Sequence, residues 1–253
     1  MRLMKMSGAG LVLALTAAVS MLAVARAAGA EVPPRLPFAA GEHAVYEVRL
    51  GVPIGTGTLS VTGMQTVQGE PAYHTVMTLR GGTFFYRVDD RYESWIDADG
   101  LFSRRFHQNL REGGYRRNRT YDFFPGQRTW RRENNETGTL PTSEPLDDLS
   151  FLYVARTLPL VVGETYRLPR YFKADGNPVE LRVLRRETVR VPAGTFRTIV
   201  VRPVIRTDGM FGEGRAEVHF SDDAHRIPVL IRTAGIPIGG DLVMRLRSFR
   251  PGT

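Results

Sequence analysis

Short alternations of apolar and polar residues, each ended by a turn, recur along the chain and constrain its fold more than any other feature. From Ala44 to Leu50, apolar side chains stand at every second position, which is typical of a strand with one buried face. Turns such as 97–100 and 192–194 separate the segments, because Asp binds its own backbone and Gly accepts a positive φ. Phe84–Val88 and Arg91–Ile96 are predicted as two such strands.

We count roughly twelve to fourteen strands of this kind and one principal helix. The helix is predicted from Ser143 to Leu158, because Pro145 suits a first turn and Asp147 and Asp148 complement the positive end of the helix dipole. The pattern predicts an all-β fold, either a large antiparallel barrel or a strongly curved open sheet, with the helix at an end or in the concavity. A two-sheet β-sandwich is the alternative.

The first thirty residues have a different composition from the rest. Arg2 and Lys5 open the chain without an acid, and Leu11–Val24 is almost wholly apolar. Small residues follow in the order Ala25-Arg26-Ala27 and Ala28-Gly29-Ala30. This order of a basic, an apolar and a small-residue region predicts a cleavable signal peptide over residues 1–30.

Cleavage after Ala27 or Ala30 leaves a single β-rich domain over residues 31–253, with an extended, Pro-rich lead-in at 31–40. An uncleaved membrane anchor is the alternative, but a spanning helix needs about 20 apolar residues. No later stretch is apolar enough to span a membrane, so we expect a periplasmic or otherwise exported protein without a transmembrane span. The chain has no Cys and must be stable without disulfides.

Arginine carries nearly all of the positive charge. Only Lys5 and Lys173 are lysines among the 34 basic residues. Without the three basic residues of the signal segment, 31 basic and 26 acidic residues remain, a net charge of +5. Arg binds carboxylate or phosphate through two parallel hydrogen bonds, although a GC-rich genome explains the same usage. Nucleic acid is not an expected partner, because a secreted protein rarely meets it.

The segment from Arg104 to Arg132 is the richest in candidate binding residues. It holds nine Arg against Glu112 and Asp122, and strand alternation places several of them on the same faces as aromatic residues. Such a surface suits an anionic group on an apolar or ring-shaped ligand. Alternatively, the Arg stems cover the aromatic rings and their charged heads are solvated. The predicted ligand-binding residues are Arg104, Phe106, Tyr115, Arg117, Arg119, Tyr121, Arg128 and Trp130.

No motif predicts a catalytic, metal or cofactor site. The chain has no G-x-S-x-G sequence, and none of its five His has the H-E-x-x-H spacing. His219 and His225 flank Asp222-Asp223, where an ordinary turn is the simpler interpretation. Adjacent carboxylates on a strand point to opposite faces and do not form an acid/base pair by themselves.

Several motifs together resemble a known family. They are Phe38-x-x-Gly41-Glu42, Gly55-Thr-Gly57, Leu146 to Arg156, Val191-Pro-Ala-Gly194-Thr-Phe196, and Phe220-Ser-Asp-Asp223 with Arg226-x-Pro228. The chain resembles the bacterial exported family called domain of unknown function (DUF) 3108, from about Phe38 to about Leu246. The resemblance implies secretion and a β-rich domain, but no reaction and no catalytic residues. Its structural motif residues are Gly41, Glu42, Asp148, Tyr153, Arg156, Gly194 and Asp223, and Arg156 is expected to reach an acid such as Glu42.

The sequence therefore favours a non-catalytic periplasmic binding or envelope-maintenance protein. Its expected ligand is a lipid, a lipoprotein acyl chain or a glycan, held in a concavity that the side chains of a curved sheet do not fill. This function predicts an apolar concavity with Arg at its mouth. An enzyme acting on envelope polysaccharide is one alternative, and it needs two carboxylates converging beside Trp95 or Trp130. The other is a structural module that binds an envelope protein partner through an exposed edge strand.

Overall fold

The computed structural model of the protein describes residues 36–206, 214–234 and 240–253. The predicted signal peptide (1–30) and the first residues of the predicted lead-in lie outside the described residues. Residues 36–253 cluster as one unit. In the described part of the chain, no helix has the length and apolar character needed to cross a bilayer.

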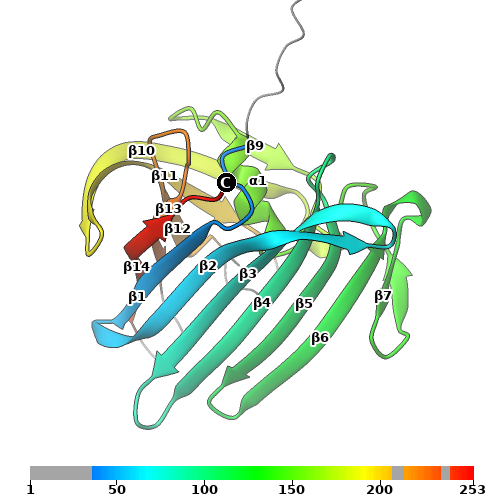
Figure 1. Ribbon diagram of the computed structural model, residues 1–253, viewed down its shortest axis with the longest axis horizontal. Coiled ribbons are helices and arrows are strands. Elements are labelled where there is room, and N and C mark those ends of the chain that lie inside the picture. The colour runs from blue at the N-terminus through cyan, green and yellow to red at the C-terminus, as the bar shows by residue number, and fades with distance from the viewer. Residues whose placement is uncertain (1–35, 207–213, 235–239) are drawn as a thin grey trace, which may run out of the picture. The chain divides into compact units, whose positions relative to one another are not determined.

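Fourteen strands form one antiparallel sheet (Figure 1). They are β1 (His43–Leu50), β2 (Val52–Val67), β3 (Glu70–Gly82), β4 (Arg87–Asp97), β5 (Ser103–Glu112), β6 (Tyr115–Phe124), β7 (Thr129–Arg132), β8 (Thr137–Thr139), β9 (Thr165–Leu168), β10 (Val179–Val191), β11 (Gly194–Val204), β12 (Ala216–Ser221), β13 (Pro228–Thr233) and β14 (Leu242–Arg250). The helical elements are η1 (Pro125–Gln127), α1 (Ser150–Thr157) and η2 (Ala174–Gly176). The predicted strand-rich fold with one principal helix is confirmed.

The sheet consists of two meanders that meet at β1. Strands β1 to β8 follow one another outward on one side, and β14 back to β9 follow on the other. Strand β1 joins the halves, because it pairs with β2 and also with β14. β8 and β9 are the two edges, so the sheet is strongly curved and open rather than a closed barrel. A single sheet also rules out the two-sheet sandwich.

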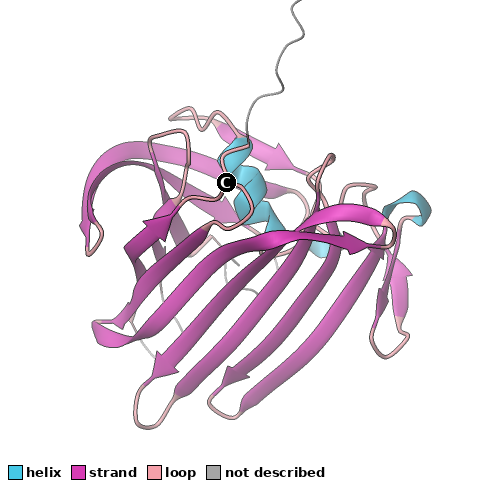
Figure 2. Cartoon of the chain, viewed as in Figure 1, coloured by secondary structure: helices cyan, strands magenta, loops and turns pink. Residues whose placement is uncertain are grey.

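Helix α1 lies within the curve of the sheet, near one end of the strands (Figure 2). Seven of its eight residues are buried. The prediction that the helix begins at Ser143 is wrong. The backbone of Leu146 instead pairs with Arg170 and Phe172 as a short bridge, and the Asp147 carboxylate accepts the amide N–H groups of Leu149 and Ser150 at 2.8 Å each. Asp147 therefore satisfies the first free N–H groups of a shorter helix.

The hydrophobic core fills the concave side of the sheet around α1. Alternate residues of each strand face this side, as the sequence pattern predicts. Phe106 and Phe123 are fully buried and pack against Phe172, with ring centroids 6.2 Å and 5.4 Å apart. Burying one such aromatic side chain contributes about 1.5–3 kcal/mol.

The predicted strand Phe84–Val88 is also wrong, because residues 83–86 form the turn between β3 and β4. The amide N–H of Thr83 donates to the carbonyl of Tyr86 at 2.8 Å and closes this turn. β4 then runs without a break from Arg87 to Asp97. The apolar run at residues 84–86 had suggested a strand, but it contributes side chains to the tip of a hairpin.

Candidate ligand-binding site

A mostly apolar pocket is lined by residues at the end of β1, the start of β2, the end of β3 and the start of β4. Its volume is about 120 Å³. β1 to β5 and β14 supply its walls. The pocket is lined by Val48, Ile54, Gly55, Leu79, Arg80, Gly81, Gly82, Thr83, Tyr86, Val88, Glu112 and Leu242.

Glycine backbone forms part of the pocket wall. Gly55 and Gly81 are direct partners in the register of β2 and β3. A Cβ atom on Gly55 would lie 2.1 Å from the Arg80 carbonyl oxygen, and one on Gly81 would lie 2.2 Å from the Ile54 carbonyl oxygen. The strands approach too closely here for any side chain, so the wall is bare backbone at this point.

Two carboxylates approach each other beside the pocket. Val88 faces Glu112 across β4 and β5, and strand alternation places Asp90 on the same inner face. Asp90 is 2% exposed. Burial and the neighbouring Glu112 raise the pKa of Asp90, the amide N–H of Arg111 lowers it, and the net result is a pKa of about 7. The Asp90 carboxyl group therefore gains or loses its proton near neutral pH.

Two arginines project from β6 toward the same concavity. In the register of β5 and β6, Arg117 is opposite Leu110 and Arg119 is opposite Gln108, both of which are inner-face residues. The Arg117 guanidinium lies 5.3 Å from the centroid of the Tyr115 ring. Within the described part of the chain, neither arginine forms an ion pair or a side-chain hydrogen bond.

Arg117 also acts on the buried carboxylate of Asp148. The Tyr171 hydroxyl donates to Asp148 Oδ1 at 2.7 Å, and Gln108 Nε2 donates to Oδ2 at 3.2 Å. Burial raises the pKa of Asp148, and the Tyr171 hydrogen bond and the charges of Lys173 and Arg117 partly offset this effect. The inner face of the sheet thus carries the positive charges of Arg117 and Arg119 at β6, and the apolar pocket lies on the same face, at β1 to β5 and β14.

The predicted arginine-aromatic residues do not form one surface. Phe106 and Tyr121 are buried, and Tyr121 packs between Phe172 and Trp130. Arg104 lies at a bulge in β5 and pairs with Asp97 at 2.5 Å. Of the predicted set, only Tyr115, Arg117 and Arg119 remain near the open part of the concavity.

Arg128 is also used elsewhere. It has a left-handed backbone (φ 51°), and its Nη2 donates to the Pro141 carbonyl at 2.5 Å. The indole of Trp130 covers Gly138, where a Cβ would lie 2.3 Å from the ring. These contacts fasten β7 to β8 and do not face the pocket.

Most of the motif residues hold the chain together near α1. Arg156 binds Glu42 through two hydrogen bonds, as the sequence led us to consider. Tyr153 is fully buried against Phe38, with ring centroids 5.1 Å apart. Gly41 has a φ of 85°, and its amide N–H donates to the Val61 carbonyl.

The remaining two motif residues lie in turns. Gly194 begins β11 with a φ of 133°, directly after the turn from β10. Asp223 Oδ1 accepts the Ser221 hydroxyl at 2.7 Å and the amide N–H groups of His225 and Arg226. Asp223 therefore stabilises the loop between β12 and β13 rather than a ligand site.

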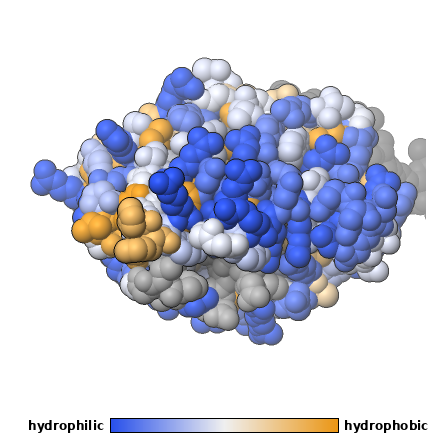
Figure 3. All heavy atoms as spheres, turned by 90° about the horizontal axis from the view of Figure 1, so that it is seen from below, coloured by the Kyte–Doolittle hydropathy of each residue, from blue (hydrophilic) through white to orange (hydrophobic). Residues whose placement is uncertain are grey.

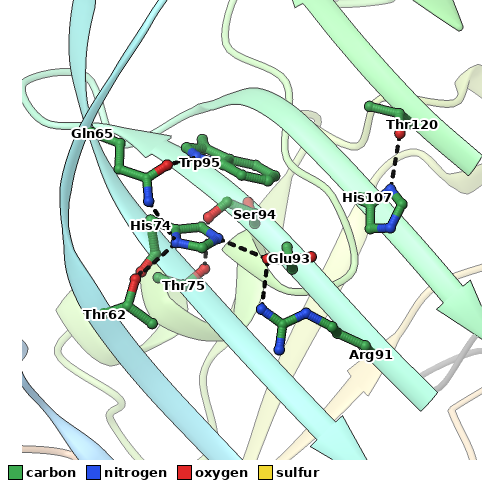
Figure 4. Close-up of polar contacts among 10 residues, drawn as sticks. All are labelled: Thr62, Gln65, His74, Thr75, Arg91, Glu93, Ser94, Trp95, His107 and Thr120. Carbon is green, nitrogen blue, oxygen red and sulfur yellow. Dashed lines mark hydrogen bonds and ion pairs between the residues drawn. The ribbon is translucent and has the colours of Figure 1, made fainter. Parts of the chain in front are cut away.

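A polar network covers the convex face of β2 to β4 (Figure 4). The His74 ring stacks on Trp95 at 4.5 Å, its Nδ1 lies 2.8 Å from the Thr62 hydroxyl, and its Nε2 lies 3.0 Å from Glu93. Burial lowers the pKa of His74, and the hydrogen bond and negative charge of Glu93 only partly offset this effect. This order of hydroxyl, imidazole and carboxylate resembles a catalytic triad.

Competing hydrogen bonds argue against catalysis by this network. Thr62 also donates to the His74 carbonyl at 3.1 Å, and Gln65 Nε2 lies 3.1 Å from the same His74 Nδ1. Glu93 is held by Arg91 at 2.8 Å. The network lies on the convex face, away from the concave pocket, so we interpret it as a set of cross-strand contacts.

No metal site is formed by the residues that the structure describes, since no three His, Cys, Asp or Glu side chains gather there. His219 lies 3.1 Å from Glu187 on β10, and the His225 ring meets the Phe249 ring edge to face, with centroids 5.7 Å apart.

Sequence reasoning missed the pocket residues. The glycines at 55, 81 and 82 were available as a signal, because Gly inside a strand marks a close backbone approach. Sequence alone does not show that Leu242 of the last strand and Val48 of the first line the same pocket, since this depends on the pairing of β1 with β14.

Comparison with known proteins identifies the family. The sequence profile of the protein of unknown function family DUF3108 matches residues 44–247. The chain belongs to the DUF3108 family. The resemblance seen in the sequence motifs is thereby confirmed. None of the curated proteins matches this DUF3108 chain.

Two solved structures match most of the chain at low sequence identity. A β-barrel-like protein of the domain of unknown function DUF1849 from Brucella abortus is 10% identical, with a TM-score of 0.52, over 85% of this chain and 99% of that chain. A protein from Bacteroides fragilis described as exported, with a YmcC-like fold, is 12% identical, with a TM-score of 0.29, over 85% and 98%. The first similarity supports the fold of this DUF3108 protein.

Proposed function

We propose that this DUF3108 protein is a non-catalytic binding protein of the cell envelope that holds an amphiphile. The apolar pocket at the open end of the concavity carries the proposal. Val48, Leu79 and Leu242 would surround an apolar chain, and each methylene moved there from water contributes about 0.8 kcal/mol. The volume suits a short acyl chain or the end of a longer one.

The anionic end of the ligand would lie toward β6. Arg117 and Arg119 face the concavity without an ion-pair partner in the described residues. Unpaired guanidinium groups on a partly enclosed face bind phosphate or carboxylate oxygens through charge-assisted hydrogen bonds. A lipid, or the acyl chain of a lipoprotein, combines these two chemical features, and a purely polar glycan does not.

Export would follow from the signal-like segment of residues 1–30. After removal of that segment, the protein would meet amphiphiles in the periplasm. The enzyme alternative has less support, because neither Trp95 nor Trp130 borders the pair of Asp90 and Glu112. Trp95 stacks on His74 of the convex face, and Trp130 packs on Tyr121.

Native mass spectrometry of the protein purified from periplasm tests the proposal. Extraction of the bound fraction should yield a reproducible lipid. Leu242→Trp fills the pocket and should abolish the bound mass, whereas Leu230→Trp, on the opposite face of neighbouring β13, should retain it. A folded protein that carries no lipid, or that carries the same lipid in both variants, contradicts the proposal.

The headgroup contact is tested separately. Arg117→Ala with Arg119→Ala should reduce the bound lipid fraction. Arg116→Ala is the matched control, because Arg116 points to the other face of β6 and donates to the carbonyls of Gly113 and Tyr115. Equal loss in the control would show that general charge, and not the inner face, binds the ligand.

A further inference from the structure

The hairpin between β3 and β4 carries two aromatic side chains into solvent. Phe84 is 92% exposed and Phe85 is 90% exposed. Their rings contact each other edge to face, with centroids 5.0 Å apart. Two adjacent Phe side chains at a hairpin tip contribute nothing to the core, so folding does not explain their presence.

The structure holds this tip in a defined orientation. Tyr86, the next residue, turns back to line the pocket, and its ring lies against Gly113 in the neighbouring hairpin. A Cβ on Gly113 would lie 2.9 Å from that ring. Because Tyr86 anchors the turn on one side, Phe84 and Phe85 project from the other side.

Other exposed apolar residues lie at the same end of the strands. Val52, the first residue of β2, is 64% exposed, and Tyr115, the first residue of β6, is 44% exposed. Figure 3 views this end and shows hydrophobic residues gathered at one side, bordered by hydrophilic ones. Four exposed apolar residues, Val52, Phe84, Phe85 and Tyr115, therefore lie at the end of the strands that carries the pocket.

Arginines surround the exposed aromatic residues. Residues 80–90 and 110–117 contain five Arg against three acids. Arg80 pairs with Asp89 at 3.0 Å, but both groups are largely exposed. Arg116 donates to backbone carbonyls, and Arg87, two residues after Phe85, is exposed. This end of the protein thus has an excess of positive charge beside its exposed aromatic pair.

We propose that this end of the protein docks on an anionic lipid surface, with the side chains of Phe84 and Phe85 entering the membrane interface. Aromatic rings are favoured at the interface, where they bury apolar area near the headgroups. Each nearby Arg adds about 1 kcal/mol of attraction to an anionic membrane. The pocket mouth, at the same end, would then face the lipids. Docking needs no bound ligand, so it stands apart from the proposed carrier function.

A membrane explains these features better than a protein partner does. A stable protein interface buries about 800 Å² on each partner across a complementary face. Here the apolar residues project from separate hairpin turns and are surrounded by arginines. A projecting aromatic tip with flexible cations around it suits a fluid anionic surface. A second copy of the chain on the same residues is an outcome that the experiment distinguishes.

Vesicle flotation of the protein purified from periplasm tests the docking. The protein should float with phosphatidylcholine vesicles that contain phosphatidylglycerol, and much less with phosphatidylcholine alone. Phe84→Ser with Phe85→Ser should weaken binding at least about tenfold. Val161→Ser with Val162→Ser is the matched control, because both Val residues are exposed in the connection after α1, and it should bind as the unchanged protein does.

Charge variants provide the second arm of the test. Arg80→Gln with Arg87→Gln should weaken binding to the anionic vesicles, and added salt should weaken binding of the unchanged protein. Equal binding of the Phe84→Ser, Phe85→Ser variant and the Val control would overturn the proposal. The proposal would also be overturned if neither the unchanged protein nor any variant bound vesicles, and if the unchanged protein self-associated while the Phe84→Ser, Phe85→Ser variant did not. The pocket-filling Leu242→Trp variant should still bind vesicles, so failure of docking and failure of lipid carriage are separate results.

Discussion

Arg156 of α1 and Glu42, the residue before β1, form a buried bidentate ion pair that ties the helix to the start of the sheet. Arg156 Nη1 lies 2.6 Å from Glu42 Oε1, and Nη2 lies 2.8 Å from Oε2. Arg156 also donates to the carbonyls of Pro37 and His225, which lie on opposite sides of the helix in the sequence. One side chain therefore joins the segment before β1, the helix and the β12–β13 loop.

Removing one partner of this pair should be costly. Arg156→Met leaves the Glu42 carboxylate buried without a counter-charge, and we expect the free energy of unfolding to fall by about 3–5 kcal/mol in urea denaturation. The double variant Arg156→Met with Glu42→Leu should recover much of that loss. Arg197→Met, at a side chain that is 81% exposed, should change it by less than about 0.5 kcal/mol. A small loss in Arg156→Met would contradict a buried, fully desolvated pair.

Phe106 is predicted from the sequence to bind a ligand, whereas the structure places it in the hydrophobic core. Because Phe106 is fully buried against Phe172, Phe106→Ala should lower the free energy of unfolding by about 3–5 kcal/mol. Tyr115→Ala, at a half-exposed ring on the neighbouring strand, should cost much less. If chemical denaturation gave equal effects for the two variants, the proposed packing of the β5–β6 inner face would be wrong.

Gly55 tests the close approach of β2 and β3. The Cβ of Gly55→Ala would lie 2.1 Å from the Arg80 carbonyl oxygen, so the strands must separate, and we expect a loss of about 1–3 kcal/mol. Gly114→Ala introduces the same methyl group where nothing lies within 4 Å, and it should be nearly neutral. Thermal unfolding of the two alanine variants checks this contrast, and a neutral Gly55→Ala would refute it.

Asp90 should make stability fall as the pH rises. The pKa of Asp90 is raised from 3.8 to about 7 in the folded protein, mainly by burial, so folding takes up a proton between these pH values. Asp90 therefore contributes its full share to the free energy of unfolding below pH 3.8, the pKa of the unfolded chain. This share is lost as the pH rises to about 7, the pKa of Asp90 in the folded protein. Asp90→Asn should flatten this slope and stabilise the protein by about 1–2 kcal/mol at about pH 8.

Urea titrations across that pH range measure the effect. Asp89→Asn is the natural control, because Asp89 is the adjacent residue on the exposed face and pairs with Arg80. A slope that is unchanged in Asp90→Asn, or that is lost equally in Asp89→Asn, would assign the pH dependence to other groups.

The position of the helix shows where sequence reasoning reached its limit. The sequence from Ser143 to Leu158 predicted a helix, and a shorter one is present from Ser150 to Thr157. Its first turn was placed too early, because Pro145, Asp147 and Asp148 are favourable helix starters by local criteria. The backbone of Leu146 pairs instead with Tyr171 and its neighbours, and a contact between distant segments has no local signal.

Local alternation in the sequence determined which segments become strands and which face of each strand is buried. It correctly placed Tyr121 and Phe123 on one face of their strand, because side chains alternate along any extended strand. Only the tertiary structure decided how these faces are used. Pairing of β1 with β14, the curvature of the sheet and the packing of Phe172 bury the middle of the face and leave Arg117 toward an open end. These contacts join residues far apart in the chain, so their energies depend on the whole fold rather than on neighbouring residues.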